Sequence, residues 1–364
     1  MTSAKPERDT RELVELANLI NLRSQDIAER VMKCQEAKDK TVCERYEEAS
    51  KRICLRDTIY HLQYLSTALR FSSISLFESY IEWLKILMAS LGIASEDLIT
   101  NHVCIEESLE EILEPETAEQ VREYLDVALE RLQGESTPVV THFGESVELS
   151  LLATQYLNAL LRSEAETAMQ LILKATREGT SLKDLYLEVF SATQYEVGRL
   201  WLNGEVSVAQ EHYCTAATQL IMSQLYPYIT GREKRGRRVF LACVKGELHD
   251  MGLRILRDFF IMDGWDTVFI GCNTPNESIV GLIKRTKPDL LAISVTMSYN
   301  LPELVELISL IRSDENSKNM KILVGGNPFL LDGDLWRRVG ADGHGVNAED
   351  ALSIAQNLVD EKLA

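Results

Sequence analysis

The chain has few basic residues relative to acidic ones, which argues against nucleic acid as a partner. The sequence has 38 lysines and arginines against 56 aspartates and glutamates, which gives a formal net charge of −18. Proteins that bind nucleic acid need clustered positive charge to contact phosphates. A short basic run lies between Arg232 and Arg238, and we expect it to be a solvated linker. The composition therefore argues against nucleic acid as the main partner.

Long hydrophobic runs and paired cysteine motifs are also missing. No stretch is long enough to span a bilayer, and the first residues include no apolar leader segment. The seven cysteines show no CxxC spacing, and their odd number leaves one unpaired in any full disulfide scheme. We therefore expect a cytoplasmic protein with free thiols and no membrane contact.

Recognisable catalytic motifs are a third absence. The sequence offers no phosphate-binding loop, no ordered Ser-His-Asp set, no zinc-ligand spacing and no defensible pair of catalytic carboxylates. We therefore do not expect a free-standing enzyme.

Glycine and proline number only 19 and 8, and very few of them interrupt the first third of the chain. From about residue 11 to 132, apolar residues recur at three and four positions, which predicts an all-α domain over residues 1–135. Residues 133–146 are rich in Gly, Ser, Thr and Pro and indicate a linker, in which His142 needs no special role.

Helical periodicity returns after this linker and then gives way to alternating strands and helices. Helices are predicted at 149–162, 164–178, 181–203 and 207–226, and they favour a four-helix bundle over residues 146–230. Strands are predicted at 237–244, 267–273, 289–296 and 321–326, with a fifth near Gly343 and helical stretches between them. We therefore expect a multidomain α plus α/β protein that ends in a doubly wound, flavodoxin-like parallel sheet over residues 236–364.

The loop from Val244 to Gly252 follows the first predicted strand and carries the residues best suited to chemistry. Such a loop lies at the carboxyl edge of a parallel sheet, where open α/β folds bind ligands. His249 can present a neutral ring nitrogen to a metal, and Glu247 or Asp250 can accept a hydrogen bond from the other nitrogen. Gly252 lets a bulky ligand approach the backbone. Taken alone, a single histidine in a loop is more often a surface or capping residue than a ligand.

The pattern resembles the cobalamin-binding domain shared by methionine synthase, corrinoid methyl carriers and B12-dependent photoreceptors. Three pieces of sequence carry the resemblance, namely Glu247-x-His249-Asp250-x-Gly252, Ser294-Val295-Thr296 and Gly325-Gly326. The resemblance implies that His249 displaces the dimethylbenzimidazole base and becomes the lower cobalt ligand. The displaced tail would then run beside Ser294 and Thr296, with Gly325 and Gly326 clearing space for it. Glu247 stands where many members have Asp, which keeps the carboxylate and lengthens its reach.

A second set of residues lies in the predicted bundle. Trp201 is followed by nine residues and then by Glu211-His212, as in the light-sensing cobalamin proteins related to the CarH repressor. The resemblance implies that Trp201 stacks over the upper corrin face and that Glu211 and His212 hold polar atoms of an adenosyl group. Without it, a Trp at a helix end is usually core and a Glu-His pair is usually solvated. Leu202 departs from that family, which has a His there to capture cobalt after illumination.

These features lead to one main functional hypothesis and two alternatives. The main one is a cobalamin-dependent light sensor that binds adenosylcobalamin and signals through a change in conformation or oligomeric state. Proteins called photocobilins pair such a module with a bilin, and the extra helical domain would suit a bilin such as biliverdin. The first alternative is a corrinoid methyl-carrier protein of a methyltransferase system, and the second is a scaffold whose B12 fold has lost its ligand. From the resemblance we also expect a homodimer or higher homo-oligomer and a downstream protein partner.

Overall fold

The structure is a computed structural model that describes residues 7–40, 48–135, 141, 143–144 and 146–363. Internal contacts divide the chain into two compact units, residues 1–138 and residues 139–364. The predicted helical bundle and parallel sheet both fall in the second unit. The three-domain division expected from the sequence is finer than this and stays a prediction. His142 and Cys43 lie outside the described residues.

The first unit is helical throughout its described residues. Its elements are α1 (Glu7–Leu22), α2 (Ser24–Lys38), α4 (Glu48–Arg70), α5 (Ile74–Ser90), α6 (Ser95–Glu110) and α7 (Pro115–Gln133). Helices α6 and α7 begin at the predicted residues, Ser95 and Pro115, with acidic side chains in the first turn. Acidic groups at a helix N-terminus interact favourably with the helix dipole, and proline suits the first helical position.

One expectation about this unit was wrong. Cys34 on α2 and Cys104 on α6 form a disulfide across 70 residues of sequence, with their Cα atoms 5.7 Å apart. The lack of motif spacing among the cysteines predicts free thiols instead. The pairing depends on how α2 packs against α6, which is information that the spacing along the chain does not carry.

The second unit begins with the bundle. It consists of α8 (Val147–Leu161), α9 (Ala165–Arg177), α10 (Leu182–Asp184), the π-helical segment η1 (Leu185–Ser191), α11 (Ala192–Leu202), α12 (Val208–Gln224) and the short α13 (Tyr226–Ile229). The third predicted helix is therefore a composite of α10, η1 and α11. Ser207 and Gln210 cap the start of α12 together. The Ser207 hydroxyl accepts a hydrogen bond from the backbone nitrogen of Gln210, and the Gln210 side-chain oxygen accepts one from the backbone nitrogen of Ser207.

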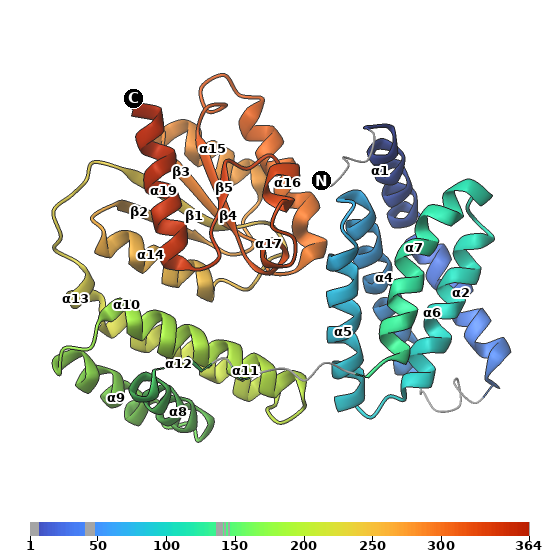
Figure 1. The fold of residues 1–364 in the computed structure, drawn as a ribbon, viewed down its shortest axis with the longest axis horizontal. Coiled ribbons are helices and arrows are strands. Elements are labelled where there is room, and N and C mark those ends of the chain that lie inside the picture. The colour runs from blue at the N-terminus through green and yellow to red at the C-terminus, as the bar shows by residue number, and fades with distance from the viewer. Residues whose placement is uncertain (1–6, 41–47, 136–140, 142, 145, 364) are drawn as a thin grey trace. The chain divides into compact units, whose positions relative to one another are not determined.

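The α/β part follows with the expected alternation (Figure 1). Its strands are β1 (Arg238–Cys243), β2 (Asp266–Gly271), β3 (Leu290–Ser294), β4 (Lys321–Gly325) and β5 (Gly343–His344). Its helices are α14 (Met251–Met262), α15 (Asn276–Thr286), η2 (Ser298–Asn300), α16 (Leu301–Arg312), α17 (Asn327–Leu331), α18 (Leu335–Arg338) and α19 (Ala348–Leu363). All strands pair in parallel in the order β2-β1-β3-β4-β5, which confirms the predicted fold class.

Bundle and sheet share one hydrophobic core. Buried residues of α8, α9, η1, α11 and α12 form a continuous cluster with β1, α14 and α19. Tyr186 of η1 is fully buried, and its ring lies edge-on to Phe259 of α14 at 6.3 Å. The shared core joins the bundle to α14, which packs beside α19 on one face of the sheet. No helix among the described residues is long and apolar enough to cross a membrane.

Candidate functional site

The loop after β1 is organised around the Glu247 carboxylate, which is completely buried. Its Oε1 accepts hydrogen bonds from the backbone of Leu248 at 3.0 Å and His249 at 3.1 Å, and from His249 Nδ1 at 2.6 Å. A buried charge is stable only when its hydrogen-bonding capacity is filled. This carboxylate therefore serves as a fixed centre for the loop.

The other oxygen of Glu247 ties this loop to the one after β3. Oε2 accepts from the backbone nitrogens of Thr296 at 2.8 Å and Met297 at 2.9 Å, and from Asn300 Nδ2 at 3.2 Å. Burial alone would raise the pKa of Glu247, but the hydrogen bonds from His249 and from these backbone groups outweigh it and bring the pKa to about 2. The group is therefore ionised throughout the physiological pH range.

His249 combines a fixed ring with an open edge. The hydrogen bond to Glu247 raises the pKa of His249; burial opposes this shift, and the charges of Glu247 and of Glu211 add to it. The side chain is 59% exposed, although its partner carboxylate is buried. Because Nδ1 is engaged with Glu247, the nitrogen left for a metal is Nε2. Of the two carboxylates proposed as partners for this ring, Glu247 is the one in contact.

Asp250 has a different role in the structure. Its carboxylate forms two hydrogen bonds with Arg254 of α14, at 2.9 and 2.8 Å. Gln219 of α12 approaches the same carboxylate at 3.5 Å. Asp250 therefore connects the loop to α14 and to the bundle. Gly252 lies in the first turn of α14, where an added Cβ would meet open space, so the backbone there is accessible.

The predicted tail-binding residues lie together at the carboxyl edge of the sheet. Ser294 and Gly325 are paired neighbours at the ends of β3 and β4, and both are half-buried. The sequence predicts that Gly326 clears space for a ligand, but the structure gives a different reason for a glycine at this position. It has a φ of 109°, and a Cβ there would lie 1.9 Å from the carbonyl oxygen of Val295. The local backbone requires glycine at 326, whatever binds nearby.

The bundle residues form a hydrogen-bonded chain along α12. Glu211 Oε1 lies 3.0 Å from the hydroxyl of Thr215, and the other carboxylate oxygen contacts His212 Nδ1. The Thr215 hydroxyl is also 2.9 Å from the amide oxygen of Gln194 on α11. Gln194 in turn donates to Thr218, at 3.0 Å. Because a hydroxyl has one proton, Thr215 donates to Glu211 or to Gln194 at any one time.

The remaining predicted residues differ in exposure. Trp201 is half-buried at the end of α11, whereas the His212 side chain is 74% exposed. The charge of Glu211 on α12 contributes to the raised pKa of His249, after the larger effects of Glu247 and of burial. His344 ends β5, with its Nδ1 buried and its ring 6.1 Å from Trp336. The Gly343–His344 strand places it on the sheet edge away from β1.

Sequence reasoning missed Asn300, Thr215 and Gln194. Asn300 is 4% exposed and belongs to the short helix η2, where no apolar period or motif distinguishes it. Thr215 lies one helical turn after Glu211, so its position relative to Glu211 was a usable signal. Gln194 lies on a different helix, and only the packing of α11 against α12 brings it to Thr215.

Comparisons with known protein families match three parts of the chain. Two models described as a B12 binding domain match residues 152–226 and residues 237–353. A model described as a phycobilisome protein matches residues 8–132. The first two cover the bundle and the α/β part separately, and the third covers the N-terminal helical unit.

Known relatives match about half of the chain. A corrinoid protein of Desulfitobacterium hafniense is 24% identical over 207 residues, which is 55% of this chain and 94% of that protein. Dimethylamine corrinoid protein 1 of Methanosarcina acetivorans is 26% identical over 175 residues, which is 46% of this chain and 79% of that protein. The solved monomethylamine corrinoid protein of Methanosarcina barkeri has a TM-score of 0.52 at 20% identity, covering 57% of this chain and 98% of its own. The last similarity shows the fold, and together the matches support a cobalamin-binding protein.

Proposed function

We propose that this chain binds a cobalamin in the base-off form, with His249 Nε2 as the lower ligand of cobalt. The observation that carries the proposal is the pair formed by Glu247 and His249. A carboxylate that holds one imidazole nitrogen sets the ring orientation and increases the basicity of the other nitrogen. The small residues Ser294 and Gly325 at the neighbouring strand ends suit the path of a displaced tail.

The protein residues around such a cofactor have separable roles. Glu247 would hold His249 in the tautomer whose Nδ1 carries the proton, which would leave Nε2 for the metal. Trp201 and Glu211 would limit access to the opposite face from α11 and α12. The cofactor itself supplies a cobalt–carbon bond, which can transfer a methyl group or break in light.

At a finer level, the relatives favour the methyl-carrier alternative over the light sensor. The relatives named above are corrinoid proteins, and two bear methylamine names. A carrier of this kind would receive a methyl group on cobalt and deliver it to partner enzymes, so it would not act as an enzyme alone. Its upper corrin face would have to open to those partners.

A light sensor remains a second candidate because of a specific observation. The phycobilisome protein match covers residues 8–132, which is the helical region to which a bilin was assigned as a second chromophore. The Glu211 carboxylate and the Thr215 hydroxyl also give α12 polar groups suited to a hydroxylated upper ligand such as adenosyl. In this candidate, loss of the upper ligand in light would alter the contact between bundle and sheet.

One set of absorbance spectra tests the cofactor proposal. Purified full-length chain is mixed with hydroxocobalamin, methylcobalamin or adenosylcobalamin in darkness, and the His249→Ala variant is treated in the same way. We expect a base-off, His-ligated spectrum in the wild-type chain and its loss in the variant. His102→Gln is the control, because that histidine lies on α6 of the first unit. Retention of the His-ligated spectrum in His249→Ala would remove the proposal.

Two further measurements separate the finer candidates. The carrier predicts that methylcobalamin-loaded protein gives up its methyl group to a thiol acceptor only with a methyltransferase present, and that light leaves its hydrodynamic size unchanged. The sensor predicts that green light changes the size of the adenosylcobalamin-loaded protein.

Biliverdin provides a separate test of the N-terminal unit. A red absorbance band that forms with biliverdin in the full chain, and is absent from residues 139–364 alone, would support the sensor. Cys54 on α4 is a half-buried free thiol of this unit, so the mass of the denatured chain distinguishes a covalently held bilin from a dissociable one. Failure of biliverdin to bind in darkness or in light would leave the carrier as the candidate.

A further inference from the structure

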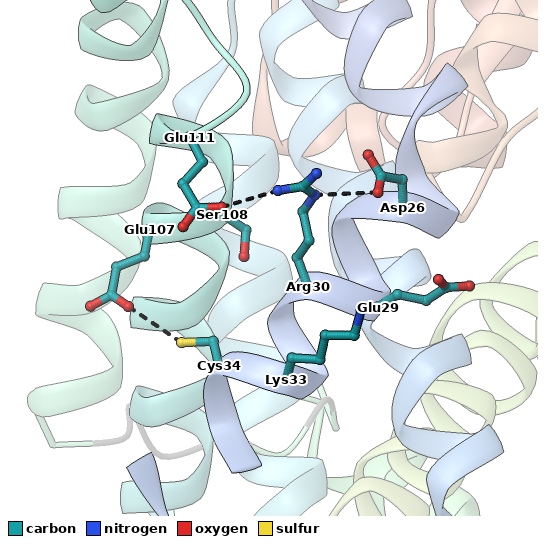
Figure 2. A pocket seen from close by; sticks show the side chains of 8 residues that line it. All are labelled: Asp26, Glu29, Arg30, Lys33, Cys34, Glu107, Ser108 and Glu111. Atoms are coloured by element: carbon teal, nitrogen blue, oxygen red, sulfur yellow. Dashed lines mark hydrogen bonds and ion pairs between the residues drawn. The ribbon is translucent and has the colours of Figure 1, made fainter. Parts of the chain in front are cut away.

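A cavity on the first unit contains a cluster of groups that the cobalamin site does not use. The cavity has a volume of about 410 Å³ and lies between α2 and α6. Figure 2 shows the side chains that line it. Its lining residues are Asp26, Glu29, Arg30, Lys33, Cys34, Glu107, Ser108 and Glu111. The lining contains four carboxylates and two basic groups, so its charge balance favours a cation.

Three potential metal-binding groups meet at one side of this cavity. The sulfur atoms of Cys34 and Cys104 and a carboxylate oxygen of Glu107 all lie within 4.8 Å of one another. Cys104 is fully buried, Cys34 is half-buried and Glu107 is exposed. The cluster therefore runs from the interior to solvent, which gives an ion a path of entry.

The contact between Cys34 and Glu107 suits a reduced state. The Cys34 sulfur lies 3.3 Å from Glu107 Oε2, a distance at which a thiol donates a hydrogen bond to a carboxylate (Figure 2). A disulfide sulfur has no proton to donate. The carboxylate is thus positioned for a thiol, or for a cation that replaces the thiol proton.

The backbone spacing also suits shared coordination. Zinc binds thiolate sulfur at about 2.3 Å, so two sulfurs on a tetrahedral ion lie roughly 3.8 Å apart. The Cα atoms of Cys34 and Cys104 are 5.7 Å apart, and side-chain rotation alone can open the sulfurs to that separation. Glu107 lies one helical turn after Cys104 on α6, so both groups project on one side of the helix.

We propose that Cys34, Cys104 and Glu107 form a redox-gated site for a thiophilic divalent cation such as Zn²⁺. In the oxidised state the two sulfurs are bonded to each other and no ion binds. A dithiol or phosphine reductant supplies two electrons, the sulfur–sulfur bond breaks, and each sulfur takes one proton. The ion then displaces both thiol protons to solvent and binds two thiolates and the Glu107 carboxylate, with water completing four ligands.

Basic side chains near the proposed site would compete with a cation for its carboxylate. Lys38 pairs with Glu107 Oε1 at 2.8 Å, so an incoming ion replaces this ammonium group as the partner of the carboxylate. Arg30 is occupied by Asp26 and Glu111, at 3.2 and 3.1 Å. Its charge is therefore largely compensated within the cavity.

The experiment measures Zn²⁺ uptake by the full-length, cobalamin-free chain before and after reduction with a water-soluble phosphine. The phosphine gives two electrons to the disulfide and becomes a phosphine oxide, with its oxygen taken from water. The two protons of that water molecule complete the two thiols. Under anaerobic conditions, with a chromophoric chelator as competitor, we expect the reduced chain to bind one more Zn²⁺ than the oxidised chain. Co²⁺ in place of Zn²⁺ should give a thiolate-to-cobalt charge-transfer band.

Matched variants make the result specific. Cys34→Ser should abolish the extra ion, whereas Cys54→Ser, which removes a free thiol of the same unit, should retain it. Glu107→Gln keeps both cysteines and should weaken binding at least tenfold, while Glu29→Gln, on the same cavity wall, should leave it within twofold. Equal uptake by oxidised and reduced chain, or an unchanged extra ion in Glu107→Gln, would overturn the proposal.

Discussion

Among single residues, Glu247 has the most demanding environment near the proposed cofactor. Six hydrogen bonds from the loops after β1 and β3 converge on its two oxygens. A glutamine at this position has one acceptor oxygen, and its amide protons would face donors. The negative charge of Glu247, and not only its shape, therefore holds the two loops together and orients the His249 ring.

We predict that Glu247→Gln lowers the affinity for cobalamin by about 10–100-fold, because the His249 ring loses its orienting carboxylate. Spectral titration with hydroxocobalamin measures the effect. Glu277→Gln is the control, since that exposed carboxylate lies on α15. Equal affinities for wild type and Glu247→Gln would contradict the assigned role of the carboxylate.

The Thr215 hydroxyl gives a second prediction for single residues. Thr215→Val removes a hydrogen-bond partner of Glu211 while it preserves shape, which costs about 1 kcal/mol, or roughly a fivefold change in affinity. If Glu211 contacts an adenosyl group, the loss should affect adenosylcobalamin and spare methylcobalamin. Thr154→Val on α8 provides the same chemical change on an exposed surface. A parallel loss for both cobalamins would show that Thr215 acts on the fold alone.

Among the elements, the π-helical segment η1 (Leu185–Ser191) is one of the places where the bundle contacts α14. Tyr186 donates a hydrogen bond of 2.7 Å to the buried Asp258, which also pairs with Arg257 at 2.6 Å. Burial raises the pKa of Asp258, and the hydrogen bonds and charge of Arg257 and the hydrogen bond of Tyr186 act against that shift. The pair therefore holds together two elements that are far apart in sequence.

Tyr186→Phe should lower the free energy of unfolding of the second unit by about 1–3 kcal/mol, because Asp258 loses one of its buried donors. Urea unfolding followed by circular dichroism measures this change. Tyr228→Phe, at an exposed position of α13, should change stability little. Similar unfolding curves for Tyr186→Phe and wild type would mean that the hydrogen bond contributes no net stability.

Helix α4 carries a buried histidine whose titration should destabilise the first unit in acid. Burial and the nearby His102 lower the pKa of His61 from 6.5 to about 3. Below pH 6.5 the unfolded chain binds a proton that the folded chain accepts only near pH 3. As the pH is lowered from 6.5 toward 3, the free energy of unfolding therefore decreases, by up to about 1.4 kcal/mol for each pH unit. His61→Phe, in its aromatic surroundings, should reduce the slope, as urea unfolding at pH 7 and pH 5 can establish.

The elements also show what the sequence could and could not predict. Four strands lie within two residues of their predicted bounds, because apolar runs of this length are typical of strands in a parallel sheet. Strand β5 is only Gly343–His344, too short to have such a run. The π-helical segment interrupts a helix whose apolar period is continuous. At the site, Glu247, His249, Ser294 and Gly325 followed from a motif, whereas Asn300 and Gln194 needed tertiary packing to be found.

For the whole molecule, all residues assigned to cobalamin lie in the second unit, residues 139–364. The bundle and sheet of that unit share a core, so we predict that this fragment folds and binds hydroxocobalamin with an affinity within about twofold of the full chain. Side-by-side titrations of fragment and full chain check this. Much weaker binding by the fragment would contradict the prediction that the second unit binds cobalamin independently.

The shared core also has a consequence for synthesis of the chain on the ribosome. The bundle helices emerge before any strand of the sheet, and strand β1 pairs with β3 some 50 residues later, as Val239 with Leu290. Until α14 has been synthesised, the apolar face of the bundle that meets it has no complement. A pause in translation between α13 and α14 would therefore prolong the exposure of this apolar face to solvent.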